Sequence, residues 1–256
     1  MWNRAGLKAN AKENLKRYYW PAFLVCIISG IFNGGGGSYG GYNNIQTRYD
    51  SQYSSFQSFK ENLLRPDMLW LIGIVASVGL IVILISIAVS LLVGNPLLVG
   101  KNRYFMCSRD VKTGVGEIGF AFSCGYFWNI VKIMFLMNLY IFLWSLLLVI
   151  PGIIKSYEYA MVPYILAENP GIDSKRAFEL SKEMMMGEKW NYFVLGLSFI
   201  GWYLLGFLAC CIGVVFVSPY YEATMAEFYG WAREKMIAVG YSNHIELKGF
   251  GEGVEF

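Results

Sequence analysis

The chain has 256 residues, of which 56% are hydrophobic and only 15% are charged, whereas charged residues make up about 25% of a typical soluble domain. So little polar surface argues against a soluble globular protein and indicates an integral membrane protein. The net charge is only +3, and the basic residues lie in short segments between apolar runs, which is typical of membrane proteins and not of nucleic-acid-binding proteins.

The first 19 residues predict an amphipathic surface helix. Arg4, Lys8, Lys12 and Lys16 recur every four residues, so they form one basic stripe on a helix. Such a helix either lies on an anionic membrane surface, with lipids as its partners, or is a solvated helix that orients the first span. Both interpretations place the N-terminus in the cytoplasm.

Apolar runs recur along the rest of the chain. A membrane span needs about 20 mostly apolar residues. Runs without any charged residue are the strongest candidates, and two shorter runs carry a few acids or a lysine. In chain order the runs cover residues 20–32, 68–100, 133–154, 153–167, 190–221 and 214–231.

Polar segments separate these runs. Residues 33–67 open with four glycines and are rich in Ser, Tyr, Asn and Gln, which predicts a flexible extracytoplasmic loop. Residues 101–125 predict a basic loop, and residues 169–189 predict a second surface helix, capped by Asp173. Residues 240–256 are polar and Gly-rich, which predicts a disordered C-terminal tail.

Charge sets the predicted topology of an all-α, polytopic transmembrane helical bundle that forms a single domain over residues 1–239. With six spans, the basic segments and both termini lie in the cytoplasm, in agreement with the positive-inside rule. Four spans would place the four basic residues of segment 169–189 outside, so we favour six. The shortness of the fourth and sixth runs supports the alternative of four.

Several strings of residues carry a family resemblance. They are LKANAKENLKRYYW (7–20), LWSLLLVIPGIIKSYEYAMVPYILAENP (143–170), SKEMMMGEKW (181–190), LSFIGWYLLG (197–206) and SPYYEATMAEFY (218–229). Together they resemble the bacterial DUF975 family of integral membrane proteins, found mostly in Firmicutes, over nearly the whole chain except residues 33–67 and the tail. The resemblance implies a helical protein of the bacterial plasma membrane. It implies no catalytic residue, because the family has no assigned activity.

Charged residues inside a span are costly and therefore mark candidate functional sites. Lys155 and Glu158 are spaced i, i+3, which predicts an ion pair with either a functional or a structural role. Glu222 lies deeper in its run, and we expect it to pair with Lys155 or Lys132. It is either a protonatable group or cation ligand in a polar cavity, or only a hydrogen-bonded structural residue.

Catalytic and metal-binding patterns are missing from the sequence. The only histidine, His244, lies in the predicted tail, and there is no HExxH or CxxC motif. We therefore expect no enzyme activity, no metal and no cofactor.

Two functional hypotheses follow. The first is a non-catalytic membrane protein that serves as a scaffold, as an envelope-stress or immunity-type component, or as a partner of another membrane protein. The alternative is a small transporter or permease for a lipid or a peptide. Broken helices, buried acids and a weak internal repeat between residues 146–163 and 207–224 favour this alternative.

Overall fold

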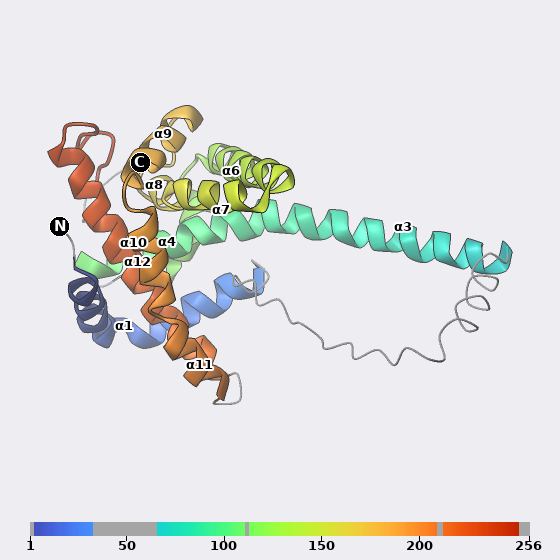
Figure 1. The fold of residues 1–256 in the computed structure, drawn as a ribbon, viewed down its shortest axis with the longest axis horizontal. Coiled ribbons are helices and arrows are strands. Elements are labelled where there is room, and N and C mark those ends of the chain that lie inside the picture. Colours follow the sequence, from blue (N-terminus) through green and yellow to red (C-terminus); the bar gives the residue numbers. More distant parts are fainter. Residues whose placement is uncertain (1–2, 33–65, 111–112, 209–211, 251–256) are drawn as a thin grey trace.

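The computed structural model describes residues 3–32, 66–110, 113–208 and 212–250, and all regular structure within them is helical (Figure 1). This confirms the all-α class, while the predicted loop over 33–67 lies outside the described residues except for its last two. The helices are α1 (Arg4–Phe32), α3 (Pro66–Val89), the π-helical turn η1 (Ser90–Gly94), α4 (Asn95–Asp110), the 3₁₀ turn η2 (Val115–Gly119), α5 (Phe120–Ser123), α6 (Phe127–Leu147), α7 (Val149–Glu158), α8 (Val162–Glu168), α9 (Ser174–Met184), α10 (Lys189–Leu197), α11 (Ile200–Leu208) and α12 (Ile212–Ala238).

The long apolar helix α3 has almost no protein around it. α3 runs without a break through η1 into α4, and Figure 1 shows α3 projecting away from the other helices. The π-helical turn lies just before Pro96, which lacks an N–H and interrupts the regular hydrogen-bond pattern. Two helical segments, Gly73–Arg109 and Phe127–Leu147, are long and apolar enough to cross a membrane. The number of spans beyond these two stays a prediction.

The predicted basic loop over residues 101–125 is wrong in its first half. These residues continue as α4, and Lys101 and Arg103 are both buried there. Burial of these cations is possible because each has an acidic partner, Glu222 for Lys101 at 2.7 Å and Glu117 for Arg103 at 2.8 Å. Tyr104, on the same helix, is fully buried in the core.

The buried core lies at one end of the molecule, around α4, α8, α9 and the C-terminal half of α12. Every residue of α8 is buried, and α8 packs against both α4 and α9. The largest buried side chains include Phe105 of α4 and Phe228 and Tyr229 of α12. This end therefore has a compact core of its own, unlike the projecting α3.

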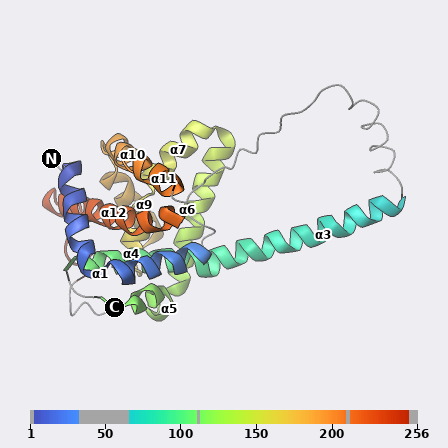
Figure 2. The same cartoon turned by 90° about the horizontal axis from the view of Figure 1, so that it is seen from below.

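The α6–α7 hairpin exposes apolar side chains at its tip. α6 turns into α7 at Leu148, and Gly152 allows the two helices to approach closely, because a Cβ there would lie 2.2 Å from Ser145 Oγ. Ile150 at this tip is 73% exposed, and Leu205 on α11 is 62% exposed. In Figures 1 and 2, the α6–α7 turn and the apolar end of α1 lie on the side toward which α3 extends. The tip of the α6–α7 hairpin and the apolar end of α1 therefore lie on the same side as α3.

α1 divides into a basic half and an apolar half. The backbone at Tyr18 is not helical (φ −139°, ψ 26°), which marks the division. The apolar stripe of the first half, including Leu7 and Leu15, is buried, and α1 packs chiefly against α12. Within the predicted basic stripe, Arg4 and Lys12 are exposed and Lys8 is half-buried, whereas the side chain of Lys16 lies outside the described residues.

The described part of the tail packs on the core, in contrast to the predicted disorder. Leu247 is fully buried. Glu246 accepts a hydrogen bond from Arg176 Nε of α9 at 2.7 Å, and this bond, with a second from Ser242, lowers the pKa of the Glu246 carboxyl. A short polar sequence is thus held by charge-assisted bonds that its composition does not reveal.

Candidate functional site

A polar cavity of about 640 Å³ lies between α1, η1, α4, α6, α8, α10 and α12. Its size falls within the range of about 300–1,000 Å³ that is typical of small-molecule sites. We refer to it as the polar cavity. Its lining residues are Cys26, Ser90, Asn95, Leu98, Lys101, Asn102, Asn138, Ala160, Pro163, Tyr164, Tyr192, Ser218, Tyr221, Glu222 and Met225.

An ion pair lies in the wall of the polar cavity. Lys101 Nζ of α4 donates to Glu222 Oε1 of α12 at 2.7 Å, and the two side chains are only 11% and 17% exposed. The predicted partners of Glu222 were therefore wrong. Lys132 is exposed on α6, and Lys155 binds a different acid. The sequence does not indicate the correct partner, because its pattern predicts a loop outside the bundle at Lys101.

One buried hydrogen-bond donor in the cavity wall is unsatisfied. Asn95 Nδ2 is buried and has no hydrogen-bond partner among the described residues. A buried polar group left without a partner costs about 1–3 kcal/mol, so a polar ligand or water in the cavity would stabilise it. The tyrosines of the wall add aromatic faces, which attract cations. The cavity thus brings a cation, an anion and aromatic rings to one space, beside the buried amide of Asn95.

The other predicted ion pair is present but lies outside the polar cavity. Lys155 Nζ donates to Glu158 Oε2 at 2.6 Å, and Lys189 Nζ at the start of α10 donates to Glu158 Oε1 at 2.5 Å. The Glu158 side chain is only 8% exposed. None of the three residues lines the cavity. Glu158 therefore links α7 to α10 through its ion pair with Lys189, which favours the structural role over the functional one.

A buried carboxylate that the sequence analysis missed joins α8, α12 and the tail. Glu168 is fully buried and accepts three hydrogen bonds, from Tyr229 hydroxyl at 2.6 Å, Arg233 Nε at 2.7 Å and the Gly249 backbone N–H at 2.6 Å. Tyr229 and Arg233 are four residues apart and therefore lie on one face of α12. That spacing is a signal of a shared polar partner, although it does not identify Glu168.

A second ion pair links α4 to α12, beside the one in the cavity. Arg109 Nε donates to Glu227 Oε1 at 3.1 Å, and Asn14 of α1 donates to the same oxygen at 3.1 Å. The Glu227 side chain is only 7% exposed. Lys101 and Arg109 are eight residues apart, so both lie on one face of α4. In the sequence, this spacing indicates that one face of α4 packs against a helix that carries acidic residues.

The basic stripe of α1 faces outward beside α11. Lys8 Nζ lies 4.2 Å from the centre of the Phe199 ring and donates to Ser198 O at 3.3 Å. Partial burial, together with the neighbouring charge of Arg4, lowers the pKa of Lys8. Within the described residues, no group of three His, Cys, Asp or Glu side chains lies close enough together to hold a metal ion.

Comparison with known proteins gives one match. No curated protein and no solved structure matches the chain. The family model described as "Protein of unknown function (DUF975)" matches residues 43–235, which is more than half of the chain. The matched region includes both residues of the ion pair in the polar cavity, Lys101 and Glu222. The chain therefore belongs to the DUF975 family.

Proposed function

We propose that the chain is a multi-pass protein of the bacterial plasma membrane with both termini in the cytoplasm. The exposed apolar surface of α3 supports this, since none of its most apolar stretch is buried. Exposed apolar surface on this scale is unfavourable in water, whereas lipid solvates it. The tail packs on the compact core, away from the projecting α3, and we place this end at the cytoplasmic surface.

A single cysteine on α9 tests this orientation. The side chain of Lys175 is 84% exposed, so Lys175→Cys in a background without the five native cysteines is accessible to reagents. We expect a membrane-impermeant maleimide to label it only after cell lysis, because basic segments stay in the cytoplasm. Ser51→Cys, in the predicted outer loop, is the control and should be labelled in intact cells. Labelling of Lys175→Cys in intact cells would contradict the proposed orientation.

We further propose that the protein is a non-catalytic permease for a small zwitterionic solute such as a short peptide. The polar cavity carries this proposal, because it places Lys101 and Glu222 side by side beside the unpaired amide of Asn95. A peptide carboxylate fits Lys101 and its ammonium group fits Glu222. Pro219, three residues before Glu222, interrupts the helical hydrogen bonds of α12, as in transporter helices that line binding sites.

Uptake into proteoliposomes tests the permease. Labelled dipeptides, free amino acids and short-chain lipids are offered to wild-type protein, Glu222→Gln and the surface control Glu179→Gln, whose side chain is 48% exposed. We expect dipeptide uptake that falls at least about tenfold in Glu222→Gln, corresponding to about 1.4 kcal/mol, and is unchanged in the control. Absence of uptake across the whole panel would contradict the proposal.

A scaffold or an envelope or immunity-type component is the second candidate. The observation that favours it is the same exposed α3, which offers an apolar surface to another membrane protein as readily as to lipid. The uptake assay separates the two candidates. If none of the labelled compounds is taken up, and Val78 of α3 forms a reproducible crosslink to a second protein, the scaffold is supported.

A further inference from the structure

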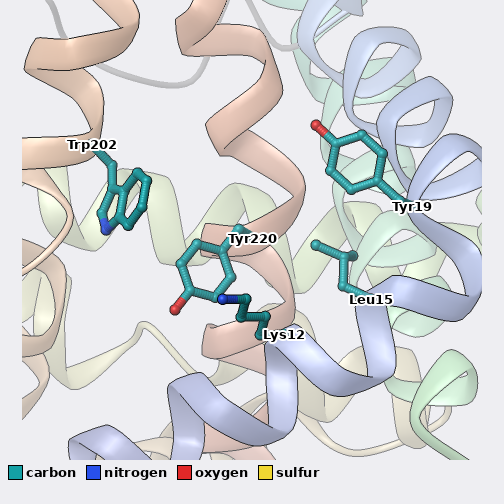
Figure 3. A pocket seen from close by; sticks show the side chains of 5 residues that line it. All are labelled: Lys12, Leu15, Tyr19, Trp202 and Tyr220. Atoms are coloured by element: carbon teal, nitrogen blue, oxygen red, sulfur yellow. The ribbon is translucent and has the colours of Figure 1, made fainter.

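A second hollow, of about 420 Å³, lies between α1, α11 and α12. Figure 3 shows the side chains that line it, which come from all three helices: Lys12, Leu15, Tyr19, Trp202 and Tyr220. We refer to it as the α1–α11–α12 groove. It shares no lining residue with the polar cavity, so it is a separate site.

The walls of the groove are apolar or aromatic except at one position. Trp202 is 52% exposed, and its ring meets that of Tyr220 edge to face with centres 6.4 Å apart. Tyr19 donates its hydroxyl hydrogen to Phe216 O at 3.0 Å. Its polar group is thus satisfied by protein, and the ring remains as apolar wall. Such a surface suits a hydrocarbon chain.

The exception is Lys12, the only charged residue among the described side chains that line the groove. Lys8 lies one helical turn before it, and Arg4 one turn before that. These three cations form none of the ion pairs found within the described residues. The apolar groove therefore lies beside cations that have no carboxylate partner in the part of the chain that the structure describes. This combination is complementary to an anionic amphiphile.

We propose that the α1–α11–α12 groove binds one anionic phospholipid. Its acyl chain lies against Trp202 and Tyr220, and its phosphate group binds Lys12 and Lys8. Tryptophan rings favour the headgroup level of a bilayer, and Trp20, just beyond the kink of α1, is 70% exposed beside this site. The inference requires the proposed membrane location but not the transport of a solute through the polar cavity.

The occupant is expected to be selected by charge and not by chain packing alone. Juxtamembrane lysines each favour anionic lipid by about fivefold, whereas a zwitterionic lipid gains only the apolar contacts. The half-burial of Lys8 against Phe199 holds its ammonium group in place beside the groove. A bound phosphate would also reduce the repulsion between Lys8 and Arg4.

Fluorescence quenching by brominated lipids tests the site. The full chain is reconstituted in phosphatidylcholine vesicles that contain a small, equal fraction of either brominated phosphatidylglycerol or brominated phosphatidylcholine. The difference between wild type and Trp202→Phe isolates the Trp202 signal. We expect the brominated phosphatidylglycerol to quench this signal about fivefold or more effectively. The double variant Lys8→Gln/Lys12→Gln should lose the preference, while Lys132→Gln, an exposed lysine on α6, should keep it.

Three results would overturn the proposal. Equal quenching by both tracers would mean that bulk lipid fills the groove, and a preference that survives the double variant would mean that other groups select the lipid. No quenching by either tracer would mean that protein covers the groove. Vesicles made wholly of brominated lipid report membrane insertion separately through total tryptophan quenching. Circular dichroism confirms that each variant is folded.

Discussion

Glu168→Ala should lower the free energy of unfolding by about 4 kcal/mol. Glu168 is fully buried and satisfies Tyr229, Arg233 and the Gly249 N–H at once. Its removal leaves the Arg233 guanidinium, which is only 15% exposed, without a counterion and two further donors without an acceptor. The measurement is denaturant unfolding of the full chain in detergent, followed by circular dichroism.

The matched control is Glu179→Ala on the neighbouring helix α9. Glu179 is 48% exposed and lies 3.9 Å from Lys175, so its loss should cost no more than about 0.5 kcal/mol. Glu168→Gln keeps an acceptor but loses the charge, and it should fall between the two. Equal stability of Glu168→Ala and Glu179→Ala would show that the cluster around Glu168 does not hold the tail to α8 and α12.

The helical elements could be predicted from sequence because they depend on local properties. Long apolar runs predict membrane-spanning helices. In the structure, two of these runs form the helices α3 and α6. Asp173 before a polar helix is a preferred cap, and its side chain accepts from the Lys175 backbone N–H at 3.0 Å. The pair Lys155–Glu158 follows from helix geometry alone. Each of these predictions uses residues of one continuous segment of the chain.

The candidate site could not be predicted in full because its contacts are distant in sequence. Lys101 and Glu222 are 121 positions apart, and Glu168 and Arg233 are 65 apart. A single sequence carries periodicity but no pairing information, so a cluster of cations after an apolar run resembles a loop. Glu222 was identified because an acid in an apolar run is unusual, but its partner was not.

Removal of one charge from the polar cavity should be costly, and removal of both should restore much of the loss. Glu222→Gln is expected to lower the free energy of unfolding by about 3 kcal/mol, because Lys101 is left buried without its counterion. Lys101→Met should lower the free energy of unfolding by a similar amount, because the Glu222 carboxylate is then left buried without its counterion. The double variant leaves no buried charge, so it should be less destabilised than either single variant. Unfolding in detergent measures all four proteins of this cycle.

The exposed pair Lys175 and Glu179 provides the control cycle, with an expected coupling of about 0.3–0.5 kcal/mol. If the coupling free energy between Lys101 and Glu222 is as small as that of the control cycle, the two residues do not form a buried ion pair. The double variant also separates structure from transport. If the pair only supports the fold, dipeptide uptake should return along with stability. If Lys101 and Glu222 bind the solute, the double variant should be stable and still inactive, because neither charge remains to receive the ammonium or the carboxylate group.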